Sequence, residues 1–237
     1  MQIWREWRGV ALFIVLMLLF RSVIADWNQV PSGSMRPTIL IGDRVVVDKL
    51  AYDLRVPFSI RRLSRFDDPG RGDIVTFESP QDGRLLIKRV IGLPGDRIAM
   101  QDNELIVNGQ PADYRRVAGE ELTRLELPDA ERFEVLEETI ADQSWITLRL
   151  KQFNRQVKSF EEVLVPAGQY YMLGDNRDRS GDSRYIGLVD RAAILGRAHT
   201  VAFSLDYDNY FIPRTTRYGR SLAAAERSQQ MPAPPGS

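Results

Sequence analysis

Short runs of β-branched and aromatic residues dominate the sequence from Arg44 onward and restrict the fold more than any other feature. Examples are RVVVDKL, DIVTFES, RLLIKRVIG, ELIVNG, SWITLRLK, QYYMLG and HTVAFSL. Runs of this length, separated by Gly, Pro, Asp and Asn, are typical of strands joined by tight turns. One segment, RIAMQDNELIVNG, is expected to form a hairpin that turns at Asp102 and Asn103. The sequence therefore predicts an all-β protein.

Gly9 to Phe20 form an unbroken apolar run near the N-terminus, and the apolar pattern continues past Arg21 to Ala25. A helix over residues 9–25 would be about 25 Å long, slightly short of the roughly 30 Å of a hydrocarbon core. Three of the chain's four tryptophans flank this run, and such amphipathic rings settle at membrane interfaces. We therefore predict a transmembrane anchor over residues 9–25.

Two other interpretations of the apolar run remain open. Its basic start, its apolar centre and the ending Val23-Ile24-Ala25 also fit a secretory signal that is cleaved. A soluble core helix fits less well, because the run has no polar face. We favour the anchor, and the arginines in residues 1–8 favour a cytoplasmic N-terminus with the remainder of the chain exported.

Composition excludes several classes of chemistry. The 237 residues include no cysteine and a single histidine, His199, which excludes disulfides, thiolate sites and multi-histidine metal sites. Lysine plus arginine and aspartate plus glutamate are equal at 32 each, so no excess of positive charge indicates nucleic-acid binding. Almost all basic residues are arginine; the exceptions are Lys49, Lys88, Lys151 and Lys158. We expect no metal or other cofactor and no nucleic-acid partner.

The segment VPSGSMRPTIL, residues 30–40, places Ser32 and Ser34 on a stretch of turn-forming residues soon after the apolar run. Taken alone, such a segment reads as an ordinary turn. A serine hydroxyl becomes a nucleophile only when a base lies within hydrogen-bond reach. His199 is the only imidazole and lies on a predicted strand, where a structural role is the simpler interpretation.

Lys88 is the other candidate base, because it lies in the apolar strand segment LLIKRVIG. A free lysine has a pKa of about 10.4, so nearly all of it is protonated at neutral pH. Burial among apolar neighbours disfavours the cation and can lower this pKa by several units. A salt-bridged lysine on an edge strand is the alternative that the sequence leaves open.

Aspartates and arginines alternate in GDNRDRSGDSRYIG, residues 174–187. A calcium loop that starts at Asp178 does not fit, since Ser183 and Val189 stand where that loop needs glycine and glutamate. A solvated turn does not require such dense pairing of opposite charges. We therefore favour a third interpretation, in which these residues form a buried network that orients a catalytic residue.

Taken together, PSGSMRPT, RGDIVTF with LIKRVIGLPGD, and GDNRDRSGDSRYIGLV resemble the ordered motifs of type I signal peptidases, the membrane-bound leader peptidases of bacteria. The resemblance runs from Leu12 to about Ser204, apart from a glutamate-rich segment over residues 101–164, which we call the insert. It implies a mainly β fold: an antiparallel β-sheet catalytic core carrying the insert as a β subdomain, preceded by one N-terminal transmembrane helix. The expected units are a cytoplasmic N-terminus (1–8), the anchor (9–25), the catalytic core (26–100 and 165–222), the insert (101–164) and a disordered tail (223–237).

The resemblance also implies roles for individual residues. Ser34 matches the nucleophile and Lys88 its general base, and Ser32 would join the backbone N–H of Ser34 in the oxyanion hole. Ser180 would hydrogen-bond to Lys88 and orient it. Asp182 and Arg184 are expected to form the supporting ion pair. Asp175 and Arg177 are expected to brace the same loop.

Pockets for small substrate side chains at P1 and P3 are implied at four residues: Val30, Pro31, Met35 and Ile87. Two positions depart from the family pattern. Asn28 stands where an apolar pocket residue is common, and Arg179 stands where an asparagine is frequent.

The function implied is that of a membrane-bound serine endopeptidase that removes N-terminal signal peptides from exported preproteins. The expected partners are these preproteins, the lipid bilayer and, as a candidate, the protein translocation machinery. The expected location is the bacterial cytoplasmic (inner) membrane, with a single pass and the catalytic domain on the periplasmic side. Two alternatives are a membrane-anchored adaptor that kept this fold without catalysis and a self-cleaving Ser-Lys regulator. The regulator is the weaker, because an apolar run stands where such proteins carry a DNA-binding module.

Overall fold

The computed structural model describes residues 7–10, 12–14, 17–18, 25–57, 59, 61–152, 158–207, 209–223 and 225–226. Residues 7–10, 12–14 and 17–18 are helical. In this described part of the chain, no helix is both long enough and apolar enough to cross a membrane. The remaining residues of the predicted anchor before Ala25, residues 1–6 of the predicted N-terminal unit and residues 227–237 of the predicted tail lie outside the described residues.

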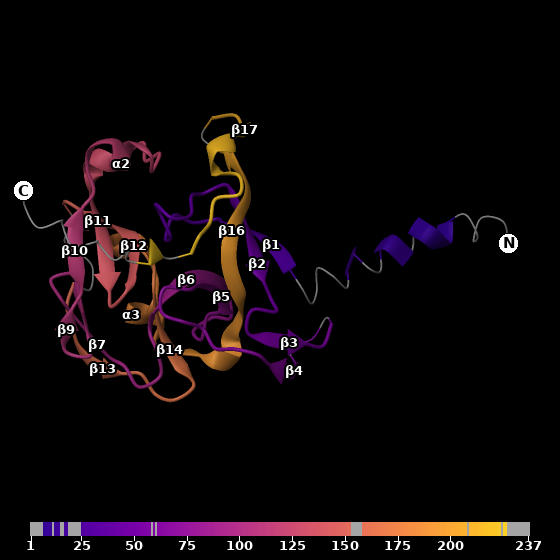
Figure 1. Ribbon diagram of the computed structural model, residues 1–237, viewed down its shortest axis with the longest axis horizontal. Helices are drawn as coiled ribbons and strands as arrows, with labels where there is room; N and C mark the ends of the chain where they lie inside the picture. The colour runs from indigo at the N-terminus through magenta and orange to yellow at the C-terminus, as the bar shows by residue number, and fades with distance from the viewer. Residues whose placement is uncertain are drawn as a thin grey trace, which may run out of the picture.

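The largest sheet has eight strands in the order β1-β2-β16-β5-β6-β14-β15, with β17 paired to β16. These strands are β1 (Ala25–Gln29), β2 (Asp43–Asp48), β5 (Ile74–Glu78), β6 (Leu85–Gly92), β14 (Gln169–Leu173), β15 (Val189–Asp190), β16 (Ile194–Asp206) and β17 (Ile212–Pro213). All the neighbouring pairs are antiparallel. The long strand β16 runs through the middle of the molecule and pairs with both β2 and β5 (Figure 1).

Three smaller sheets complete the fold, in the orders β10-β11-β12-β18, β13-β7-β8-β9 and β3-β4. Their strands are β3 (Asp53–Arg55), β4 (Arg62–Arg65), β7 (Arg97–Gln101), β8 (Glu104–Val107), β9 (Gln110–Pro111), β10 (Asp113–Arg116), β11 (Phe133–Ile140), β12 (Gln143–Leu150), β13 (Phe160–Leu164) and β18 (Ala225–Glu226). Short helices are α2 (Gly119–Thr123), α3 (Ser183–Ile186), η1 (Ala130–Arg132), η2 (Arg177–Arg179), η3 (Arg191–Ala193) and η4 (Thr215–Arg217). The prediction of a mainly β, antiparallel fold is confirmed.

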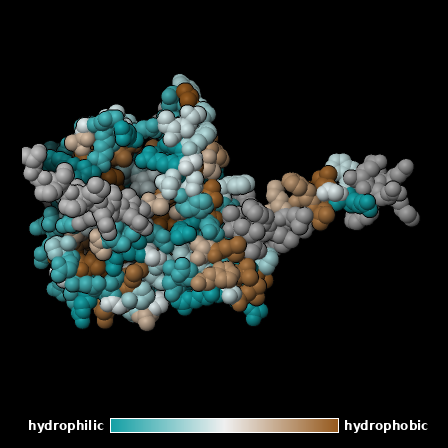
Figure 2. All heavy atoms as spheres, viewed as in Figure 1, coloured by the Kyte–Doolittle hydropathy of each residue, from teal (hydrophilic) through white to brown (hydrophobic). Residues whose placement is uncertain are grey.

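The insert and the catalytic core share apolar contacts. Leu105 and Trp145 of the insert belong to one buried cluster with Ile91 of β6 and Leu173 of β14. Leu40, the last residue of the serine segment, belongs to a second cluster formed mainly by residues of the insert. Apolar burial of this kind is the main favourable term in folding, so the insert packs firmly against the segments that carry the motifs. Figure 2 shows that hydrophilic side chains cover most of the visible face of the β body, with hydrophobic residues in small patches.

The hairpin predicted at Asp102 and Asn103 is present, since β7 and β8 pair up to Gln101↔Glu104. Both turn residues have positive φ, 48° and 69°, which matches a two-residue hairpin turn and suits Asp and Asn better than most residues. β3 and β4 pair antiparallel, with Asp53 opposite Arg65, and every residue of β4 is exposed.

One domain prediction needs a correction. The tail from residue 223 was expected to be disordered, but Ala225 and Glu226 form β18 and pair with Ser144 and Gln143 of β12. The physical reason is that β12 otherwise ends the sheet with unpaired backbone groups, and a short strand satisfies them regardless of a polar composition.

Candidate active site

The serine segment lies between β1 and β2 and is fixed by its apolar side chains. Val30, Met35 and Ile39 are all nearly fully buried in a cluster with residues of β2 and β16. Backbone hydrogen bonds close the turn, from Arg36 N to Gly33 O at 3.2 Å and from Ile39 N to Met35 O at 2.9 Å. The anchored apolar residues leave the hydroxyl of the intervening serine free to face β6.

Lys88 and Ser34 meet at the centre of the site. Lys88 Nζ donates to Ser34 Oγ at 2.8 Å and to the carbonyl oxygen of Ile87 at 2.9 Å, so neither hydrogen-bond partner is a carboxylate. The lysine side chain is buried within β6, between β5 and β14. Burial lowers the pKa of Lys88 from 10.5 to about 8, against the opposing charges of Asp182 and Asp175. A substantial fraction of neutral amine is therefore present near neutral pH.

Ser32 lies at the exposed side of this pair. Its Oγ is 3.4 Å from Ser34 Oγ, and the Ser32 side chain faces solvent. Of the four expected pocket residues, Val30, Met35 and half-buried Ile87 pack in one apolar cluster, whereas Pro31 is exposed.

Asp182 and Arg184 form the expected ion pair, with Nε to Oδ1 and Nη2 to Oδ2 both at 2.8 Å and both side chains fully buried. Asp182 Oδ2 also accepts a hydrogen bond from the backbone N–H of Gly174 at 3.1 Å. The pair therefore ties the beginning of the loop over residues 174–187 to its centre.

Asp175 and Arg177 do not pair with each other. Asp175 takes both guanidinium bonds of Arg89, at 2.8 and 2.6 Å, and both of these side chains are 1% exposed. Arg177 reaches into the insert and forms a buried ion pair with Glu138. Each of the two residues thus joins the loop to a different neighbouring element.

The expected hydrogen bond between Ser180 and Lys88 is a prediction that the structure corrects. Ser180 is buried near Ser34, but its Oγ has no hydrogen-bond partner among the described residues. The hydroxyl is packed against Gly174: a Cβ added there would lie 2.2 Å from Ser180 Oγ and 2.6 Å from Ser34 O. Lys88 makes its hydrogen bonds to Ser34 and the Ile87 carbonyl instead.

Sequence reasoning missed Asn176, which holds the serine segment directly. Its backbone N–H donates to Ser34 O and its side-chain Nδ2 to Gly33 O, both at 3.0 Å. Arg89 was also missed, although it stands beside Lys88. The only sequence signal for Asn176 was its place inside the charged motif, where the alternating charges of its neighbours are more conspicuous.

His199 is not part of this arrangement. It lies exposed on β16, and its Nδ1 is 2.6 Å from Thr200 Oγ1. Asn28 is half-buried on β1 opposite Val45. The structure therefore brings Ser32, Ser34, Lys88 and the loop over residues 174–187 together, and His199 lies outside this group.

A family model described as signal peptidase, peptidase S26 matches residues 4–203 of the chain. A signal peptidase I of Pseudomonas fluorescens is 37% identical over 205 residues, which cover 81% of this chain and 69% of that protein. A signal peptidase I of Pseudomonas aeruginosa is 36% identical with the same coverage. A crystal structure of a signal peptidase I from Enterococcus faecalis aligns with 56% of this chain and 97% of its own, at 28% identity and a TM-score of 0.34.

Proposed function

The chain belongs to the signal peptidase family, peptidase S26, whose members are serine endopeptidases, and on this premise we propose that Ser34 is its nucleophile and Lys88 its general base. The observation that carries the proposal is the 2.8 Å contact between Lys88 Nζ and Ser34 Oγ. A nucleophile and its base must lie within such a distance for proton transfer.

Burial supplies the second requirement of a base. With its pKa lowered to about 8, Lys88 is neutral often enough to accept the Ser34 proton through its lone pair. Ser34 Oγ then attacks the carbonyl carbon at P1 and forms a tetrahedral intermediate. The Lys88 ammonium returns the proton to the leaving amine as the scissile C–N bond breaks, which leaves an acyl-enzyme. Water, deprotonated by Lys88, releases the cleaved signal peptide from Ser34.

The oxyanion of the intermediate is stabilised by the Ser34 backbone N–H and the Ser32 hydroxyl. Ser32 suits this role because it is exposed beside the nucleophile, where a substrate carbonyl reaches it. Preorganised donors of this kind stabilise the charge that develops in the transition state. Asn176 keeps the turn in place through the carbonyls of Gly33 and Ser34.

The substrates are signal-peptide-bearing preproteins with small residues at P1 and P3. The proposed pocket is the apolar wall formed by Val30, Met35 and Ile87, with Pro31 at its rim. Bulky aliphatic groups make up this wall, so we expect only a small substrate side chain such as alanine to fit beside them.

We place this activity at the bilayer, with residues 9–25 as a single-pass anchor, residues 1–8 in the cytoplasm and the catalytic part outside. The core comprises residues 26–100 and 165–222, and 101–164 form the insert. From Ala25 to Ser34 the chain extends at most about 30 Å, so the nucleophile stays close to the membrane. A reporter fused after Ser237 should lie outside the cytoplasm; a soluble protein whose mature N-terminus is Asp26 would contradict the anchor. The translocation machinery is a candidate partner.

The direct test uses the full-length chain in detergent and a preprotein as substrate. We expect cleavage by the unaltered chain and none by Ser34→Ala or Lys88→Ala. Cleavage that persists in Ser34→Ala but is lost in Ser32→Ala would move the nucleophile to Ser32. A folded chain that cleaves no preprotein would favour the non-catalytic adaptor, against which the Ser34–Lys88 contact argues.

A further inference from the structure

Phe133, the first residue of β11 in the insert, contacts two arginines that belong to the active-site segments. The guanidinium carbon of Arg36 lies 5.6 Å from the centre of the ring, and that of Arg179 lies 5.5 Å from it. Arg36 follows Ser34 by two residues, and Arg179 directly precedes Ser180. Guanidinium groups at this distance from an aromatic face are attracted to it. One buried ring of the insert therefore holds both segments of the site.

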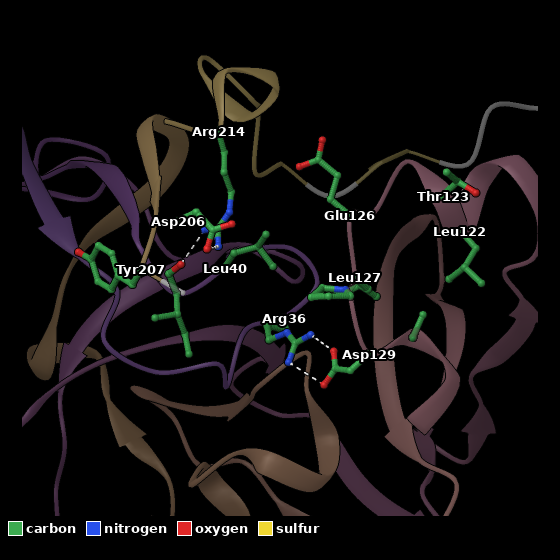
Figure 3. A pocket seen from close by; sticks show the side chains of 13 residues that line it. Arg36, Leu40, Leu122, Thr123, Glu126, Leu127, Asp129, Asp206, Tyr207 and Arg214 are labelled. Carbon is green, nitrogen blue, oxygen red and sulfur yellow. Dashed lines mark hydrogen bonds and ion pairs between the residues drawn. The ribbon is translucent and has the colours of Figure 1, made fainter. Parts of the chain in front are cut away.

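Asp129 of the insert adds a charged contact to the same arginine. Arg36 donates through Nη1 to Asp129 Oδ2 at 3.4 Å and through Nη2 to Oδ1, and both side chains are partly buried (Figure 3). Burial acts to raise the pKa of Asp129, but the hydrogen bonds and charge of Arg36 and the charge of Arg179 hold that pKa below its ordinary value. Asp129 is therefore ionised at neutral pH and fixes Arg36 by two hydrogen bonds.

The side chain of Arg36 lies across Gly33, the residue between the two serines. A Cβ added at Gly33 would be 3.1 Å from Arg36 Cδ and 3.6 Å from its Cγ. The backbone N–H of Arg36 donates to Gly33 O, which also accepts from Asn176 Nδ2. A change in the position of Arg36 is thus transmitted to the turn that carries Ser34.

We propose that Asp129 and Phe133 are positioning residues for the reaction: they hold Arg36 against Gly33 and thereby fix Ser34 relative to Lys88. The inference rests on the proposed Ser34–Lys88 dyad, and it gives the insert a part in turnover. Neither residue touches the reacting atoms. Their contribution lies in the distance between nucleophile and base, where an error of about 1 Å can cost roughly a hundredfold in rate.

A second ion pair in the same cleft provides a matched control. The cleft has a volume of about 930 Å³ and is lined by Arg36, Asp129, Asp206 and Arg214 among others (Figure 3). Arg214 pairs with Asp206 at 2.8 Å, and the two side chains are about as exposed as those of the first pair. Arg214, however, donates to the carbonyls of Ile41 and Leu205, whereas the backbone N–H of Arg36 donates to Gly33 within the serine turn itself.

The experiment measures kcat and KM for preprotein cleavage by the full-length chain, together with the thermal unfolding midpoint. We expect Asp129→Asn to lower kcat by about tenfold with KM changed less than about twofold, because only the geometry of the chemical step is altered. Asp206→Asn should leave kcat unchanged. The exchanged pair Arg36→Asp with Asp129→Arg should have a higher kcat than Arg36→Asp alone, since the ion pair forms again in reverse.

Three results would overturn the proposal. The first is an unchanged kcat in Asp129→Asn while Ser34→Ala is inactive. This result would reject the positioning role and remain consistent with the Ser34–Lys88 dyad. The second is a loss of kcat that is as large in Asp206→Asn as in Asp129→Asn and that follows a fall in the thermal unfolding midpoint. Such a result indicates a general structural effect. The third is an exchanged pair no more active than Arg36→Asp. Cleavage by Ser34→Ala would instead overturn the proposed function itself.

Discussion

Glu138 on β11 and Arg177 in the loop over residues 174–187 form an ion pair whose side chains are 0% and 1% exposed. Glu138 also accepts hydrogen bonds from Tyr114 at 2.7 Å and from Trp145 Nε1 at 3.0 Å, so its carboxylate is well satisfied. The carbonyl of Arg177 accepts from Arg184, the partner of the buried Asp182. The pair is therefore a second connection between the insert and the site, deeper than the contact at Arg36.

Loss of this carboxylate should be costly. Glu138→Ala leaves the Arg177 cation buried without its partner, and we expect the free energy of unfolding to fall by about 3–5 kcal/mol. Urea unfolding at neutral pH measures this free energy for Glu138→Ala and for the unaltered chain. The control is Glu120→Ala, which removes the exposed Glu120–Arg124 pair and should cost less than about 0.5 kcal/mol. Similar small losses in both variants would contradict the structural importance of the buried pair.

Gly174→Ala should nearly abolish turnover. The added methyl would lie 2.6 Å from the carbonyl oxygen of Ser34, which is backbone and cannot turn aside, so the nucleophile or the loop must move. We expect kcat to fall by at least roughly a hundredfold. Gly181→Ala in the same loop is the control, because nothing lies within 4 Å of a Cβ there. Unaltered kcat in Gly174→Ala would refute the close approach of Gly174 and Ser34.

Ser32→Ala tests the oxyanion hole. Ser32 is exposed, so its loss should leave the unfolding midpoint unchanged while kcat falls by about 10²–10³, the usual effect of removing one donor. Steady-state cleavage of a preprotein separates kcat from KM. Complete inactivity in Ser32→Ala with retained cleavage in Ser34→Ala would exchange the roles of the two serines.

Local features of the fold could be predicted from the sequence. The β-branched runs predict the strands, and Asp102-Asn103 predicts its hairpin because the signal lies in adjacent residues. The three motifs also indicated Ser34 and Lys88, which the structure places in contact although 54 positions separate them. A motif carries this information because its residues are needed together at one site.

Ion-pair and hydrogen-bond partners that depend on the packing of distant segments could not be predicted from the sequence. Arg177 pairs with Glu138, 39 positions away in the insert, and no pattern in either segment indicates it. Asn176 binds the serine turn through backbone carbonyls, which every residue has and no sequence distinguishes. The Ser180 hydroxyl faces Gly174 rather than Lys88, a matter of ångströms that sequence spacing does not determine.

The lowered pKa of Lys88 should also be visible in stability. The unfolded chain keeps a pKa near 10.5 and the folded chain about 8, so between these values the unfolded state binds more protons at this position. The contribution of the lysine to stability therefore rises with pH across this window and is lost as pH falls through 8. Relative to Lys88→Met, the free energy of unfolding should increase by about 3 kcal/mol from pH 7 to pH 11. If the difference in the free energy of unfolding between the unaltered chain and Lys88→Met does not change with pH, the pKa of Lys88 is not lowered by folding.

The most direct measurement is the pH dependence of kcat/KM for preprotein cleavage by the full-length chain and by Lys88→Arg. We predict that kcat/KM of the unaltered chain rises with pH to a plateau above an apparent pKa of about 8, because the neutral amine of Lys88 is the base. Lys88→Arg should be inactive at every pH, since a guanidinium does not deprotonate in proteins. Substantial cleavage by Lys88→Arg, or a rate that is flat through pH 8, would contradict the Ser34–Lys88 dyad.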